Sequence, residues 1–101
     1  MQARYAARFE RDMGCTEAEW LGWLPGACGV HALSIVGADA SAQVAIGDGT
    51  LLLAWSGLPD RQIALMRLPR LAVSFRFTGV DEAARERFMR YFDLFMQRGG
   101  G

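Results

Sequence analysis

The fold is decided by the stretch Arg70-Leu-Ala-Val-Ser-Phe-Arg-Phe-Thr78, in which apolar and other residues alternate without a break. Side chains on a strand point alternately to its two faces, so this pattern predicts a strand with one buried face. The apolar face takes Leu71, Val73, Phe75 and Phe77, and the opposite face takes Arg70, Ala72, Ser74 and Arg76. The apolar face must pack against another element, and the flanking sequence on both sides supplies candidates.

C-terminal to this strand, from residue 80 to 98, the apolar period becomes that of a helix, and Asp81 or Thr78 is suited to cap its start. Its core stripe consists of Ala84, Phe88, Tyr91, Phe92 and Phe95. Met89, Leu94 and Met96 flank that stripe and widen the apolar arc to about 200°, where packing on one sheet needs little more than about 100°. We therefore expect these three residues to meet the N-terminal helices or a second protomer.

N-terminal to residue 70, runs rich in β-forming residues alternate with turn residues. We expect strands over 30–36, 43–46, 50–56 and 61–68, separated by turns that include 47–49 and 57–60. The last of these runs also contains good helix formers. Its alternation, and a proline at position 69 that would cut a helix short, favour a strand.

Two short helices are expected before the sheet. Tyr5, Phe9 and Met13 recur every four residues, which predicts a first helix over 3–13. Thr16 and Glu19 match a capping box and predict a second helix, which a Pro-Gly pair at 25–26 would end. The sequence thus predicts an α+β fold: two short N-terminal helices, an antiparallel meander of four to five strands, and a long C-terminal helix packed on the sheet. We expect one domain over 1–101, with Gly99–Gly101 frayed.

Composition excludes several chemistries. All 11 basic residues are arginine and balance 11 acidic ones, and the chain has a single histidine. Without lysine there is no Schiff base and no phosphate-loop lysine, and one histidine cannot form an HExxH metal site. A net charge of zero argues against nucleic-acid binding as the main role. The absence of lysine and asparagine is typical of a GC-rich genome, and we expect a protein of bacterial type.

The sequence also bears on location. Residues 1–13 are charged throughout and lack the apolar stretch of a signal peptide. No apolar run approaches the roughly 20 residues that cross a bilayer, so no membrane association is expected. Two cysteines do not make a disulfide framework. These features favour the cytoplasm, with reduced thiols.

The most specific polar pattern is Asp12-x2-Cys15 followed, after twelve residues, by Cys28-x2-His31. Two spaced ligand pairs resemble the spacing of a structural zinc site, although aspartate replaces one cysteine. The alternative is that both cysteines are small buried apolar residues and His31 is a strand residue. A cysteine with His31 is also the only nucleophilic pair that the chain offers, and no third group orients the ring.

Arg67, Arg70 and Arg76 on the strand candidates are the best candidates for ligand contact, because arginine binds phosphate or carboxylate through two parallel hydrogen bonds. Trp55 is a large anchor that could line the same pocket. A curved sheet gripping a helix often leaves an apolar cavity. We expect Phe75, Phe77, Trp55, Phe88 and Phe92 to line one here. For the three arginines, the alternative to ligand contact is that they lie on a solvated outer face of the sheet.

Three functions follow from these observations. The first is a small non-enzymatic accessory or protein-interaction module, a homodimer or the binder of another protein, with Met89, Leu94 and Met96 at the interface. The second is a small-molecule-binding domain that uses a sheet–helix cavity and an arginine as anion anchor. The third is a zinc site at Cys15, Cys28 and His31. An enzyme is not favoured, and no cofactor is expected.

Overall fold

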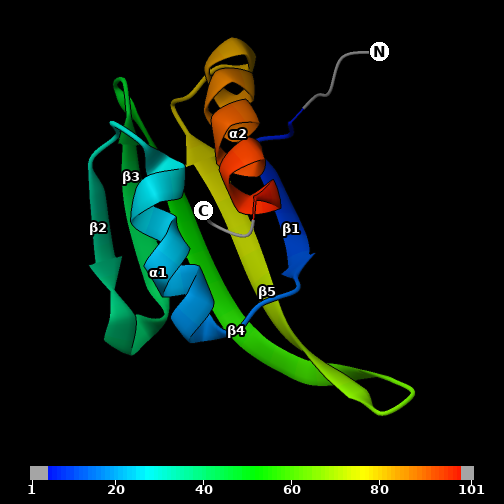
Figure 1. Cartoon of the computed structure of the whole chain (residues 1–101). Helices are drawn as coiled ribbons and strands as arrows, with labels where there is room; N and C mark the ends of the chain where they lie inside the picture. The colour runs from blue at the N-terminus through cyan, green and yellow to red at the C-terminus, as the bar shows by residue number, and fades with distance from the viewer. Residues whose placement is uncertain (1–4, 99–101) are drawn as a thin grey trace.

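The computed structural model describes residues 5–98, so the expected fraying of Gly99–Gly101 lies outside it. The chain forms an α+β fold in which two helices cover one face of a five-stranded antiparallel sheet (Figure 1). The elements are β1 (Arg8–Met13), α1 (Glu17–Cys28), β2 (Leu33–Val36), a 3-10 turn (Gly37–Asp39), β3 (Ser41–Ile46), β4 (Gly49–Ile63), β5 (Met66–Thr78) and α2 (Glu82–Gln97). The strands lie in the order β1-β5-β4-β3-β2, so the first strand pairs with the last.

The alternating stretch at 70–78 forms the strand that the sequence predicts. Its apolar side chains are buried beneath the helices and lie opposite the apolar side chains of β4. The register pairs Leu51 with Phe77, Leu53 with Phe75 and Trp55 with Val73. The other face of the sheet, which we call the open face, carries no helix (Figure 1). The structure therefore has two layers, with the core between them.

Both helices begin as the sequence predicts, but the expected end of the first at the Pro-Gly pair 25–26 is wrong, because α1 continues to Cys28. Thr16 and Glu19 form the reciprocal capping box at the start of α1, and Asp81 accepts a hydrogen bond from the Ala84 N–H at the start of α2. The helices approach closely at Gly26, where an added Cβ would lie 2.3 Å from Phe95 Cζ. A side chain at position 26 would therefore have to displace the Phe95 ring that packs between the helices.

The expected helix over 3–13 is wrong, so the fold has one N-terminal helix, not two. Residues 8–13 form β1, which pairs with the edge of β5 from Arg8–Arg76 to Met13–Leu71. Phe9, Arg11 and Met13 are partly buried, whereas the residues between them are exposed. A spacing of four is an even number, so Phe9 and Met13 share one face of a strand as well as one face of a helix.

The expected turn at 57–60 is also wrong. β4 runs through it to Ile63 with an irregularity between Leu58 and Arg61, and the chain reverses at Ala64 and Leu65. The expected single strand over 61–68 is wrong in its course: residues 61–63 end β4 and 66–68 begin β5. The chain reverses between them, where Ala64 has a φ of 54°. Pro59 and Asp60 lie in this irregularity, which has the form of a β-bulge: two residues of β4 oppose one of β5.

Candidate functional site

The β4–β5 hairpin extends beyond the rest of the sheet (Figure 1). We call residues 58–70 the arm. β3 pairs with β4 only as far as Ala54, and β1 pairs with β5 only over 71–76, so the arm consists of two strands with no third neighbour. A two-stranded hairpin is marginal in water without further packing. Among the described residues, nothing packs on its outer half, because every side chain from 59 to 68 is exposed.

The exposed residues of the arm include four large apolar side chains. Leu65 is 100% exposed, Met66 62%, Ile63 53% and Leu68 36%. Register places Ile63 opposite Met66, and β5 alternation places Met66 and Leu68 on the side of the open face. Single exposed apolar residues are ordinary, but a cluster on a projecting element is typical of an interaction site.

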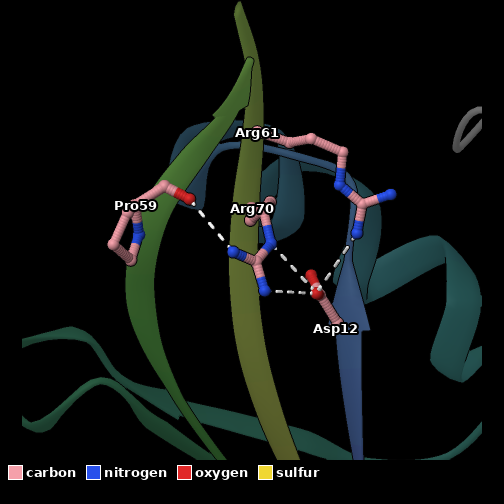
Figure 2. A network of polar contacts seen from close by, with 4 residues as sticks. All are labelled: Asp12, Pro59, Arg61 and Arg70. Atoms are coloured by element: carbon pink, nitrogen blue, oxygen red, sulfur yellow. Dashed lines mark hydrogen bonds and ion pairs between the residues drawn. The ribbon is translucent and has the colours of Figure 1, made fainter. Parts of the chain in front are cut away.

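The root of the arm is fixed to β1 by a polar network (Figure 2). Arg70 donates through Nε and Nη2 to Asp12 Oδ2, at 3.0 and 2.7 Å, and through Nη1 to the carbonyl oxygen of Pro59 at 3.3 Å. Arg61 lies 3.9 Å from the same carboxylate. The Arg70 hydrogen bonds lower the pKa of Asp12, and Asp12 in turn raises the pKa of Arg70. These contacts tie the root of the arm to β1 and involve none of the apolar residues near its tip.

A depression of about 670 Å³ lies on the open face, and we call it the hollow. Small side chains line its middle, among them Ser41, Ala54 and Ser74. Leu52 and Val36 also line it and are exposed by 41% and 46%. The hollow is thus a shallow, partly apolar surface on the side of the sheet to which Met66 and Leu68 point.

Arg8 and Arg76 stand directly opposite each other in the β1–β5 register, at the edge of the hollow. Like charges in this position destabilise a sheet. Within residues 5–98 neither guanidinium has a hydrogen-bond or ion-pair partner from the protein. Glu10, two residues from Arg8 on the same strand face, is the acidic residue that lines the hollow. The open face therefore carries a local excess of positive charge.

A second depression, of about 580 Å³, lies between the end of α1 and α2. Val30, Ile46 and Phe88 supply apolar lining, and His31 and Arg87 supply polar groups. His31 Nδ1 lies 3.0 Å from the Cys28 carbonyl oxygen, and its ring meets Phe88 edge-on at 5.2 Å. Because a carbonyl oxygen only accepts, Nδ1 donates this hydrogen bond, and in the neutral ring Nε2 is then an acceptor.

The four residues predicted to contact a ligand are not brought together. Arg76 lines the hollow and Arg70 is bound to Asp12. Arg67 pairs with Gln62 in the arm register, on the side away from the open face. Trp55 is 5% exposed, lies under the helices and donates its indole N–H to Glu17 at 2.9 Å. The expected aromatic cavity is filled, because Phe75, Phe77, Phe88 and Phe92 pack together in the core.

The residues predicted to form a zinc site are not arranged as metal ligands either. Cys15 and Cys28 are buried free thiols. Across residues 5–98, no three His, Cys, Asp or Glu side chains are placed to hold a metal ion, and the zinc hypothesis therefore has no support in the structure. Burial raises the pKa of Cys15 and raises that of Cys28 to about 11. At neutral pH both are thiols and weak nucleophiles.

The predicted interface on α2 is divided. Met89 is fully buried between α2 and the rest of the core, Met96 is partly buried, and Leu94 is 50% exposed. Of the three residues that widen the apolar arc, Met89 and Met96 are therefore covered, wholly or partly, within the chain. Tyr91, which the sequence places in the core stripe, is instead 52% exposed, and it packs near Gly29.

The apolar cluster of the arm was not predicted from the sequence. A turn at 57–60 would end the strand before the arm, so the long hairpin that carries the cluster was not expected. A network that joins the first strand to the last helix was not predicted either. Asp93 accepts hydrogen bonds from Tyr5 at 2.6 Å and from Arg11 at 2.5 and 3.1 Å. The Arg11 guanidinium lies over the rings of Phe9 and Phe75 as well. The even spacing of Phe9, Arg11 and Met13 was the available signal.

Comparison of the chain with protein-family models, with curated proteins and with solved structures found no significant match. Within the described part of the chain, neither helix has the length and apolar content to cross a bilayer. Function is therefore inferred from the arm, the hollow and the depression between α1 and α2.

Proposed function

We propose that the chain is a non-enzymatic protein-interaction module and that the arm is its contact element. The observation that carries the proposal is the set of four exposed apolar side chains at the arm tip. Burying one such side chain is worth about 1.5–3 kcal/mol. Interaction sites gain most from a few residues that become fully buried on binding, and the arm offers four exposed apolar side chains for such burial.

The organisation of the arm supports the same role. Its root is held by Asp12 and Arg70, so the direction of the tip is set before any partner arrives. Pro59 and Pro69 lack the N–H that an added strand would need, and both lie near the root. They discourage uncontrolled strand addition there and leave the side chains of the tip as the means of recognition.

The chemistry of the interior supports binding over catalysis. The thiol of Cys28 has its pKa raised to about 11 by burial, and His31 is engaged with a backbone carbonyl. Neither residue is arranged as an activated nucleophile with an oriented base. The proposal includes a cytoplasmic location, for which the two free, buried cysteine thiols are the support.

Site-specific photocrosslinking in cells tests the role of the arm. A crosslinking amino acid replaces Leu65 at the arm tip, Leu94 on α2, or Asp48 in the exposed turn between β3 and β4. We expect a discrete crosslinked product from position 65 and none from position 48. Products from 94 but not from 65 would move the interface to the α2 surface, and equal yields from 48 and 65 would refute a specific contact at the arm.

A second candidate function is the binding of a small organic anion in the depression between α1 and α2. The observation in its favour is that Arg87, which has no ion-pair partner within the described residues, borders a mostly apolar lining. Octanoate and octanol share an apolar chain but differ in charge. This candidate predicts that octanoate perturbs the His31 ring resonances more than octanol does, and that Arg87→Gln removes the difference. Equal perturbation by both compounds would exclude an arginine anchor.

A further inference from the structure

We infer that the arm binds a second copy of this chain, with the arm of each copy lying in the hollow of the other. The inference rests on the proposed function and adds the identity of the partner. Its basis is that one chain carries both halves of a complementary contact. The apolar projection and the shallow, partly apolar depression are both on the open-face side of the sheet.

The apolar parts match in kind. On the arm, Ile63, Met66 and Leu68 face the open side. The hollow offers Leu52 and Val36, which are 41% and 46% exposed. Between them the floor is made of serine and alanine side chains, which are short enough for a second backbone to approach. Contact would remove apolar surface from water on both copies at once.

The charges match as well. Arg8 and Arg76 form a like-charged pair at the edge of the hollow, and a carboxylate from the second copy would offset their repulsion. Asp60 on the arm is exposed, and no residue in the described part of the chain pairs with it. Complementary charges of this kind fix register and exclude wrong partners.

Symmetry makes these contacts additive. In a two-fold dimer, if the arm of one copy meets the hollow of the other, the reverse contact forms too, so every favourable pair occurs twice and the assembly closes. The chain has no net charge, so two copies approach without overall repulsion. The same dimer would cover the open face, which the two helices leave bare (Figure 1).

Sedimentation equilibrium of the full chain tests this inference through a charge exchange. The samples are the wild type, Arg76→Glu, Asp60→Arg and the double variant that carries both changes. We expect the wild type to dimerise and each single variant to weaken dimerisation by about 10- to 100-fold, because each places like charges together. The double variant restores the opposite charges and should recover to within about threefold of the wild type.

Two further variants complete the design. Arg87→Glu makes the same charge change on α2, outside the arm and hollow, and should leave the dimerisation constant within about twofold. Met66→Glu places a charge in the apolar contact and should abolish the dimer. Circular dichroism establishes that each variant is folded. A double variant no tighter than the weaker single variant would contradict the arm-to-hollow placement.

The outcomes separate this inference from the proposed function. A wild-type chain that stays monomeric at the highest soluble concentration overturns the second-copy partner. If position 65 still gives a crosslink to a different protein in cells, the interaction module stands with another partner. If position 65 gives no crosslink of either kind, both ideas fail.

Discussion

The inner and outer halves of β5 differ in how far their apolar side chains are buried. The inner half of β5, from Leu71 to Phe77, places its apolar side chains in a core closed by β4, β1 and two helices. The outer half, from Met66 to Arg70, has comparable apolar content but neither a third strand nor a helix against it. The same residue types therefore stabilise the monomer in one half and are free for contact in the other.

The largest expected effect comes from removing a side chain of the inner half. Phe75 is 1% exposed, stacks on Phe9 at 4.7 Å and meets Phe92 edge-on at 5.6 Å. Phe75→Ala should lower the free energy of unfolding by about 3–5 kcal/mol, because the cavity removes both apolar burial and packing contacts. Urea unfolding followed by circular dichroism measures the loss.

The matched comparison is Met66→Ala in the outer half of the same strand. Measured at a protein concentration low enough to keep the chain monomeric, it should change the free energy of unfolding by no more than about 0.5 kcal/mol. A loss similar to that of Phe75→Ala would show that the arm belongs to the core of the monomer.

A smaller effect is expected where β1 joins α2. Asp93→Asn removes the charge that accepts hydrogen bonds from Tyr5 and Arg11. Because Arg11 and Asp93 are only partly buried, we expect a loss of about 1–2 kcal/mol. Glu86→Gln, which breaks the exposed pair with Arg90 on the same helix, is the control and should cost less than about 0.5 kcal/mol. Equal losses would show that the Asp93 network is no stronger than a surface pair.

A weaker effect follows from the buried thiol of Cys28, whose pKa is raised to about 11. The unfolded thiol ionises near pH 8.5. Between these values the unfolded state loses a proton that the folded state keeps, so stability falls as pH rises through that window. Thermal unfolding between pH 7 and 10.5 should show this fall, with a shallower slope for Cys28→Ala. Parallel slopes for the two proteins would mean that the thiol titrates alike in both states.

The sequence predicted those elements whose periodicity has one interpretation. The strand at 70–78 repeats every two residues and α2 repeats at the helical period, so both could be recognised. At 5–13 the spacing of four suits strand and helix alike, and only the free edge of β5 decides between them. No local pattern records that a strand edge elsewhere in the chain needs a partner.

The candidate site was hidden for a related reason. Gly57 and Pro59 are turn formers, yet the pairing of β4 with β5 continues past them through an irregularity. The reversal falls instead at Ala64 and Leu65, residues that rarely mark a turn. Which apolar residues are left uncovered depends on how far β1 and β3 extend along the hairpin, and this is a property of the whole sheet.

Hydrogen exchange in the two halves of β5, at low and high protein concentration, tests the central claim most directly. At low concentration we predict that amides of 66–70 exchange at least about 100-fold faster than those of 71–77, because the arm lacks neighbours on both edges. At concentrations that favour association, the outer amides should become protected while the inner ones stay unchanged. Outer amides that are already as slow as the inner ones at low concentration, or that never gain protection, would contradict the account.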